Sequence, residues 1–161
     1  MSEQIYMDRF GQSHVLDEKD IVRPRSGAFI LCVQQDHLLT ILPKIAPDIY
    51  ELPGGGIEAG EDKIDASIRE WEEETGLPNS LSQCQPAKSW QQEVNFYAED
   101  VDEYWHYDQI FYLYQGTFPD LFFEGPQPTP EAGNMQWMPL DQIKNHPKFH
   151  HIHAKSLAAL L

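Results

Sequence analysis

One segment of the sequence concentrates acidic side chains at spacings that could bind a cation. Residues 69–76 read Arg-Glu-Trp-Glu-Glu-Glu-Thr-Gly, and on a helix Glu70, Glu73 and Glu74 fall at i, i+3 and i+4, within an arc of about 100°. Like charges at these spacings repel, and anions near the C-terminal end of a helix cost about 0.3–1 kcal/mol each. A hard divalent cation such as Mg²⁺ would convert this repulsion into binding. The charge pattern by itself also fits a solvated acidic helix face.

Three consecutive glycines, residues 54–56, precede this helix. Glycine allows close backbone approach, which suits a carbonyl ligand or N–H groups that face a phosphate, although ordinary tight loops also contain such runs. The spacing to the helix carries more information than the glycines themselves. Gly55 is followed after five residues by Glu61, and Glu61 after seven residues by the pair Arg69-Glu70.

The segment from Gly55 to Leu77 resembles the signature of the Nudix hydrolases. That signature is Gly, five residues, Glu, seven residues, Arg-Glu, an apolar residue, any residue, Glu-Glu, any residue, Gly and an apolar residue. Every fixed position is matched over these 23 of the 161 residues. Trp71 stands where the family usually has an aliphatic residue, and we interpret it as a packing variation because it lies on the apolar stripe of the helix.

The resemblance implies a divalent metal site with Mg²⁺ or Mn²⁺ as the cofactor. The implied ligands, all oxygen donors, are Glu70, Glu73, Glu74 and the main-chain carbonyl of Gly55. Glu74 and Glu70 would lie nearest the reacting phosphate. Glu61 and Arg69 match the family's structural ion pair, which orients the loop against the helix and so supports the ligands; an exposed salt bridge of little energetic value is the alternative for this pair.

The reaction implied by the resemblance is hydrolysis of a phosphoanhydride bond in a nucleoside di- or triphosphate, or in a nucleoside diphosphate linked to another group. Such hydrolysis needs a carboxylate that accepts the proton of the attacking water. Glu70 is one candidate. Glu131, in a proline-rich loop ahead of Trp137, is the expected downstream candidate, although it also fits an incidental loop acid. Its rivals are Glu124, Glu103 and Asp102.

Four further residues are candidates for substrate contacts. Tyr104 and Trp105 could stack on a base or ribose, and Phe149 or His150 could read a base from the segment before the last helix. Core or interface packing is an equally good interpretation of each. No Asn of the kind found in oxidised-guanine sanitisers is evident there, so the substrate stays open.

Two other functions on the same fold deserve comparison. A non-catalytic sensor that binds a nucleotide or metabolite often lacks some helix glutamates, whereas all are present here. An isomerase of prenyl diphosphates would require a catalytic cysteine, and neither Cys32 nor Cys84 lies in a suitable context. We interpret both cysteines as reduced packing residues of a cytoplasmic protein.

The elements that must position these residues follow from apolar periodicity. A helix is predicted over 62–75, with Ile64, Ile68, Trp71 and Thr75 on its buried stripe and with Gly76 and Pro78 as its stop. Strands are predicted over 27–33, 37–42, 49–52, 85–97, 106–118 and 135–138, a loop over 119–133, a helical turn over 140–145 and a closing helix over 151–161. This order predicts an α+β domain with a mixed sheet, and the resemblance implies an α/β/α sandwich.

Length and charge bound the remaining questions. A chain of 161 residues fits one domain, with residues 1–24 as an N-terminal arm or edge strand of the domain over 25–161. Eleven Lys and Arg against 26 Asp and Glu give a net charge of −15, which disfavours nucleic-acid polymers as partners. No apolar run suggests a membrane span. A small nucleotide or diphosphate is therefore the expected partner, and the aromatic strands leave a homodimer open.

Overall fold

The computed structural model describes residues 4–77, 81–131 and 133–161. Within them, nine strands form one sheet in the order β2-β1-β6-β7-β3-β4-β9-β8, with β5 paired to β3 outside this path. The β1–β6 and β3–β7 pairs are parallel and the other pairs are antiparallel, so the sheet is mixed, as predicted. The strands are β1 (Ile5–Met7), β2 (Ser13–Val15), β3 (Val22–Gln34), β4 (His37–Pro43), β5 (Gly54–Gly56), β6 (Lys88–Ala98), β7 (Glu103–Gln115), β8 (Gln127–Pro128) and β9 (Gly133–Pro139).

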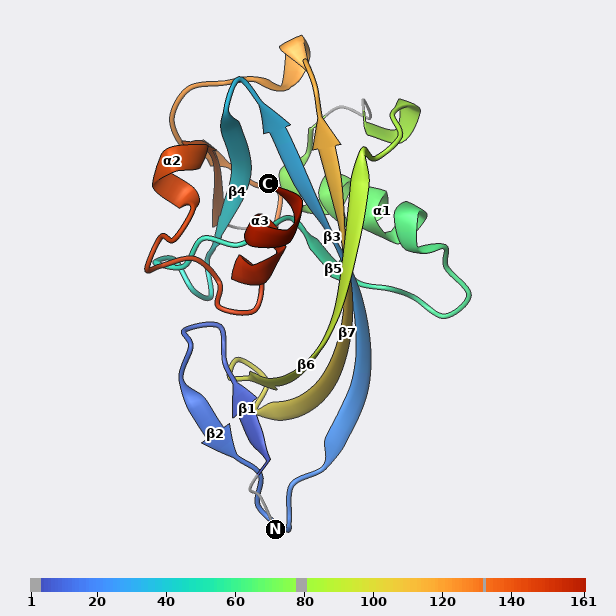
Figure 1. The fold of residues 1–161 in the computed structure, drawn as a ribbon, viewed down its shortest axis with the longest axis vertical. Helices are drawn as coiled ribbons and strands as arrows, with labels where there is room; N and C mark the ends of the chain where they lie inside the picture. Colours follow the sequence, from blue (N-terminus) through green and yellow to red (C-terminus); the bar gives the residue numbers. More distant parts are fainter. Residues whose placement is uncertain (1–3, 78–80, 132) are drawn as a thin grey trace.

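Helices cover both faces of this sheet (Figure 1). α1 (Lys63–Thr75) lies on one face, and α2 (Leu140–Ile143) and α3 (Ala154–Leu160) lie on the other. Short 3-10 turns lie at Leu81–Gln83 and Pro119–Leu121. The predicted α+β class and the α/β/α layering are confirmed.

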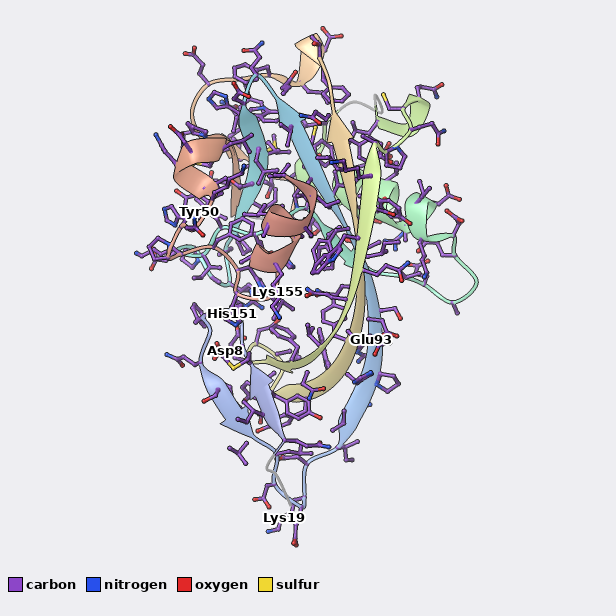
Figure 2. The ribbon with its side chains drawn as sticks, viewed as in Figure 1. Asp8, Lys19, Tyr50, Glu93, His151 and Lys155 are labelled. Atoms are coloured by element: carbon purple, nitrogen blue, oxygen red, sulfur yellow. The ribbon has the colours of Figure 1, made fainter. Side chains whose placement is uncertain are left out.

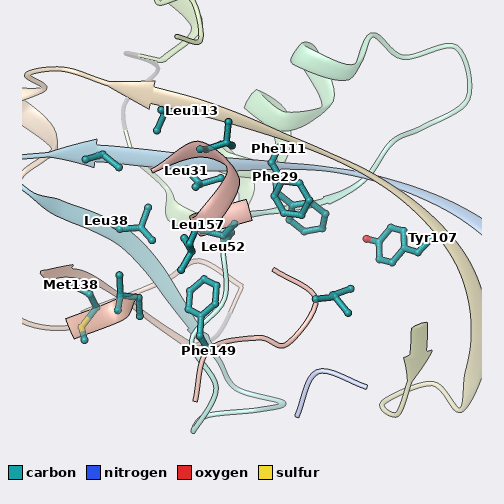
Figure 3. Packing of buried hydrophobic residues seen from close by; sticks show 14 of the residues in the cluster. Phe29, Leu31, Leu38, Leu52, Tyr107, Phe111, Leu113, Met138, Phe149 and Leu157 are labelled. Carbon is teal, nitrogen blue, oxygen red and sulfur yellow. The ribbon is translucent and has the colours of Figure 1, made fainter. Parts of the chain in front are cut away.

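The alternation of side chains along β3 divides the core into two clusters. Ala28, Ile30 and Cys32 pack in the cluster that contains Trp71 of α1. Phe29, Leu31 and Val33 face the opposite side and pack in the cluster with Phe149 and α3 (Figure 3). The continuous apolar run in the sequence is therefore a central strand that is buried on both faces.

Both ends of α1 are fixed by their capping residues. The Asp62 side chain accepts hydrogen bonds from the backbone N–H groups of Ile64 and Asp65 at the N-terminus. Gly76 ends the helix with a φ of 65°, and its N–H donates to the Glu72 carbonyl. A left-handed residue at this position favours glycine. Pro78, the second predicted stop, lies outside the described residues.

The predicted apolar stripe of α1 is only partly correct. Trp71 and Thr75 are buried, but Ile64 and Ile68 are half-buried at the margin of the core. The most deeply buried positions of the first turns are the small residues Ala66 and Ser67. Small side chains let the helix approach the sheet closely, and the Ser67 hydroxyl is satisfied by donating to the carbonyl of Ile64 at 2.7 Å.

Several other predicted boundaries differ from the structure. β3 begins at Val22, inside the predicted N-terminal arm, and residues before it form the β1–β2 hairpin at the edge of the sheet. The strand predicted over 49–52 is reduced to isolated bridges at Tyr50 and Glu51. The predicted loop 119–133 contains β8, and the closing helix starts at Ala154 because 151–153 form a turn.

β3, β6 and β7 bend together toward the β1–β2 hairpin (Figure 1). The hairpin tip reaches back to the segment before α3, where the N–H of His151 donates to the carbonyl of Arg9 at 2.9 Å. Among the described residues, no helix is long and apolar enough to cross a membrane.

Candidate active site

The glycine run forms β5 and brings α1 close to the sheet. Gly55 lies opposite Ala28 of β3, and α1 packs against both strands. A Cβ atom added to Gly55 would lie 2.6 Å from Cδ and Oε2 of Glu70. The Glu70 carboxylate therefore rests directly on the backbone of Gly55, and a side chain at position 55 would displace it.

Arg69 joins the loop to the acidic side chains. Its guanidinium binds both carboxylate oxygens of Glu61, with Nε–Oε2 at 2.8 Å and Nη2–Oε1 at 2.9 Å. Nη2 also donates to the Gly56 carbonyl at 2.9 Å. Nη1 donates to Oε1 of Glu70 at 2.9 Å and lies 3.4 Å from Oε2 of Glu73. One planar donor set thus holds the loop and two of the three helix glutamates.

The ion pair with Arg69 stabilises the ionised form of Glu61. The hydrogen bonds from Arg69, with a further bond from the Glu58 N–H, lower the pKa of Glu61 to about 2. Glu61 therefore stays ionised at any pH at which the protein would work, and it keeps Arg69 oriented toward Glu70.

Glu74 is the most enclosed of the helix glutamates. Its Oε2 accepts a hydrogen bond from the Gly54 N–H at 3.2 Å. Burial, followed by the negative charge of Glu51, raises its pKa to about 9. Burial is also the main cause of a raised pKa at Glu70. Two carboxyl groups in one enclosed site therefore lack enough positive charge to balance their ionised forms.

The third helix glutamate differs from the other two. The Glu73 side chain is 47% exposed and that of Glu70 is 15% exposed. One edge of the predicted acidic face is therefore open to solvent, and the other is enclosed. In the part of the chain that is described, the one group of three His, Asp or Glu ligand atoms within 4.8 Å of one another is Glu93, His106 and Asp108 on the exposed surface of β6 and β7. The helix glutamates are instead bound by protein donors, Glu70 and Glu73 by Arg69 and Glu74 by the Gly54 N–H.

Glu131 comes to this centre from the loop before β9. Together with Glu51 and Glu74 it lines a cavity of about 60 Å³, and its charge raises the pKa of Glu74. Two of its predicted rivals lie elsewhere. Glu103, at the start of β7, pairs with Arg23 and Arg25. Asp102, in the turn before β7, accepts a hydrogen bond from the Tyr97 hydroxyl of β6. The structure thus brings Glu131, and neither of these two acids, to Glu74.

Comparison with known proteins assigns this arrangement to a family. The family model described as the NUDIX domain matches residues 21–160. The chain belongs to the Nudix hydrolase family.

Individual relatives agree with this assignment. The chain is 24% identical over 132 residues to an RNA pyrophosphohydrolase of Pelagibacter ubique, a match that covers 79% of this chain and 84% of the relative. Its fold is similar to that of a MutT NUDIX hydrolase from Burkholderia pseudomallei, with a TM-score of 0.59, 22% identity and coverage of 86% and 99% of the two chains. It is also similar to a bifunctional NMN adenylyltransferase/ADP ribose pyrophosphatase from Francisella tularensis complexed with AMP and a manganese ion, with a TM-score of 0.63, 22% identity and coverage of 87% and 42%.

Two predicted substrate contacts of this Nudix chain lie in the core. Phe149 and His150 are each 5% exposed, and Phe149 packs in the cluster under α3. His150 stacks on His153, with ring centroids 4.0 Å apart, and burial lowers its pKa well below the usual value. His150 is thus a packing residue, whereas Phe149 contributes to a cavity of about 300 Å³ beside α2 and α3, which is lined by none of the helix glutamates.

The other two predicted substrate contacts, Tyr104 and Trp105, are half-buried on β7. Tyr104 packs edge-on against Tyr6 of the hairpin at 5.2 Å between ring centroids. Trp105 lies under the Arg25 guanidinium at 5.5 Å. Gln109 is opposite Gly27, beside the glycine loop, so Trp105 is four residues, or about 13 Å, further along the strand. These side chains lie at the far end of the same strand and not beside the helix glutamates.

The structure places two residues from outside the signature segment beside its glutamates, a placement that the sequence does not reveal. Glu51 lies just before the glycine run and shares the cavity with Glu74, and Arg9 pairs with Glu51 from a distance of 42 positions in the chain. A glutamate within a short apolar stretch could have been singled out as unusual. Nothing in the sequence links Arg9 to it.

Proposed function

We propose that this protein is a Mg²⁺- or Mn²⁺-dependent hydrolase that cleaves a phosphoanhydride bond of a nucleoside di- or triphosphate, or of a nucleoside diphosphate linked to another group. The observation that carries the proposal is the enclosure of Glu70 and Glu74 against the backbone of Gly54 and Gly55. Carboxylates enclosed in one site are costly to ionise unless a cation balances their charge.

The residues present fit a divalent cation on three grounds. The donor set consists of carboxylate and carbonyl oxygens, which Mg²⁺ and Mn²⁺ prefer. Burial raises the pKa of Glu74 to about 9, so its ionised form needs added positive charge. A Cβ at Gly55 would fill the space beside Glu70, so the glycine leaves the main chain open to close approach by an ion. Glu70, Glu73, Glu74 and the carbonyl of Gly55 would hold the ion.

When bound, the cation would neutralise the diphosphate and lower the pKa of a water molecule so that hydroxide forms near neutral pH. The protein supplies orientation and proton transfer. Arg69 holds Glu70 and Glu73 in fixed positions through Nη1, and Glu61 holds Arg69. Because these contacts exist before substrate binds, little reorganisation is needed in the transition state.

Glu70 and Glu131 remain the two candidates for the carboxylate that accepts the proton of water. Glu70 is nearly enclosed and its pKa is raised by burial, which favours proton acceptance near neutral pH. Glu131 is exposed on its loop and lines the cavity with Glu74. A larger loss of kcat in Glu70→Gln than in Glu131→Gln at saturating metal would assign the role to Glu70, and the reverse order would assign it to Glu131.

The names of relatives support the reaction class, since the Pelagibacter protein is named a pyrophosphohydrolase. Retention of all three helix glutamates favours an enzyme over a non-catalytic sensor on the same fold. The net charge of −15 favours a small substrate whose phosphates are met by a bound cation over a nucleic-acid polymer. A homodimer stays a prediction, to be checked by light scattering.

A screen of nucleoside triphosphates, dinucleotide polyphosphates and nucleotide sugars, with phosphate and pyrophosphate detection, tests the proposal. We expect hydrolysis of at least one with Mg²⁺ or Mn²⁺, loss of it with EDTA, and loss of more than about 100-fold in Glu74→Gln. Glu72→Gln is the matched control, because it removes one charge from the same helix outside the proposed ligand set. Hydrolysis that survives EDTA, or equal activity of the two variants, would refute the proposal.

A further inference from the structure

The tip of the β1–β2 hairpin, residues 8–12, brings a second arginine to the acidic centre. Arg9 is 7% exposed. Its Nη1 lies 3.7 Å from Oε2 of Glu51, its Nη2 lies 3.4 Å from Oδ1 of Asp100, and its Nε pairs with Glu99. A buried guanidinium is tolerated only with such partners. The turn therefore delivers Arg9 to a fixed set of carboxylates and not to solvent.

The hairpin tip is built to hold this arginine. Asp8 is 2% exposed, and its Oδ1 accepts hydrogen bonds from the N–H groups of Phe10 and Gln12, both at 2.9 Å. The Arg9 carbonyl accepts the His151 N–H at 2.9 Å. Figure 2 shows Asp8 and His151 where the tip meets the segment before α3. The backbone of Arg9 is thus anchored within the turn and to the body of the domain.

Glu51 is equally constrained on the other side of the pair. Its N–H and carbonyl both bond to Ile41, each at 2.8 Å, so its backbone is fixed. Its side chain is 18% exposed and lines the small cavity with Glu74 and Glu131. Of the arginines and lysines in the described part of the chain, Arg9 alone forms an ion pair with Glu51.

We propose that Glu51 is a further carboxylate of the cation site and that Arg9 is its positioning residue. Arg9 holds the Glu51 carboxylate in the cavity beside Glu74, against the repulsion of the acids around it. The hairpin at the edge of the sheet thereby contributes to the site although it lies outside the signature. This inference rests on the proposed function, because it assigns the two residues a role in binding the same divalent cation.

The full-length protein, titrated with Mn²⁺ and followed by electron paramagnetic resonance, tests the role of Glu51 without any substrate. Removal of one carboxylate charge in Glu51→Gln should weaken Mn²⁺ binding by about tenfold. Arg9→Met should also weaken it. Electrostatics acting through space predicts the opposite for Arg9→Met, since loss of a nearby cation favours cation binding. Weaker binding by this variant is therefore the signature of positioning.

A double-mutant cycle shows whether Arg9 acts through Glu51. The double variant Arg9→Met/Glu51→Gln should bind Mn²⁺ as Glu51→Gln does, because two residues that act as a unit are non-additive. Arg9→Lys should recover part of the affinity. Arg23→Met is the matched control, since Arg23 is an exposed arginine of the same sheet that pairs with Glu103 at 3.6 Å, and it should match the wild type.

Each outcome separates the two proposals. If the wild type fails to bind Mn²⁺, or Glu74→Gln binds it equally well, the proposed function falls and this inference falls with it. If those two results stand but Glu51→Gln binds as the wild type does, only this inference is refuted. Tighter Mn²⁺ binding by Arg9→Met would refute the positioning role. A loss of Mn²⁺ affinity in the double variant equal to the product of the losses in the two single variants would also refute it. Should Arg9→Met fail to fold, Arg9→Lys and Glu51→Gln, both of similar size to the native residues, carry the test.

Discussion

The contact between Gly55 and Glu70 makes a quantitative prediction about a single methyl group. In Gly55→Ala, the new Cβ would lie 2.6 Å from Cδ and Oε2 of Glu70, whereas real Cβ contacts are essentially never shorter than 3.0 Å. The carboxylate must therefore retreat by at least about 0.4 Å. Because a displacement of 1 Å can cost about 100-fold in rate, we expect kcat/KM to fall by about 10- to 100-fold, or about 1.4–2.7 kcal/mol.

Gly56→Ala is the matched control for this prediction. A Cβ at Gly56 would meet nothing within 4 Å, although the residue is adjacent in the same strand. Hydrolysis should be measured for both variants on a substrate found in the screen, with circular dichroism as a check of folding. Equal activity of a folded Gly55→Ala and Gly56→Ala would show that the position of Glu70 against the strand is not needed for turnover.

Three further predictions concern stability. The folded-state pKa of Glu74, about 9, exceeds the 4.5 of an unperturbed group. The free energy of unfolding of the metal-free protein should therefore fall as the pH rises from about 4.5 to about 9. Glu74→Gln should flatten this slope in urea titrations, and an unchanged slope would contradict the raised pKa. The pKa of Glu61 is lowered to about 2, so its contribution is present above pH 4.5 and lost as the pH falls toward 2, and Glu61→Gln should remove this acid-side loss. Asp62→Ala should cost about 1 kcal/mol of unfolding free energy by removing the N-cap of α1, and a cost near zero would show that the cap is not needed.

The sequence predicts the local structure around the signature well because local rules govern it. Asp62 and Gly76 are capping residues by type, and they bound α1 in the structure. Trp71 and the apolar run of β3 are buried, as their patterns indicate. Ile64 and Ile68 are less buried than predicted, because helical periodicity identifies an apolar face but not how closely that face approaches the sheet. At the closest approach the small residues Ala66 and Ser67 are buried instead.

The distribution of charge within the site depends on tertiary structure and could not be predicted from spacing. A helix places Glu70, Glu73 and Glu74 on one face, but only the position of β5 decides that Glu74 is enclosed while Glu73 is exposed. Arg9 and Glu51 are 42 positions apart in the sequence, and they meet because the hairpin packs against the body of the domain. No periodicity in the sequence predicts that contact.

The predicted substrate contacts show the same limit. An aromatic residue next to a predicted final helix is compatible with both a pocket and a core. In the structure Phe149 and His150 are each 5% exposed and pack in the core, and burial of this kind cannot be measured from the sequence. Trp105 lies four residues along β7 from Gln109, the residue opposite Gly27, and Tyr104 lies one residue further. The sequence alone does not give this strand register, so it could not show that both aromatic residues lie away from the glycine loop.

Anomalous diffraction from crystals grown with Mn²⁺ tests most directly whether a divalent ion belongs at the helix glutamates. We expect a Mn²⁺ peak bound by carboxylate oxygens of Glu70 and Glu74 and next to the carbonyl of Gly55. A peak at the surface group of Glu93, His106 and Asp108, with none at the helix, would contradict the proposed site.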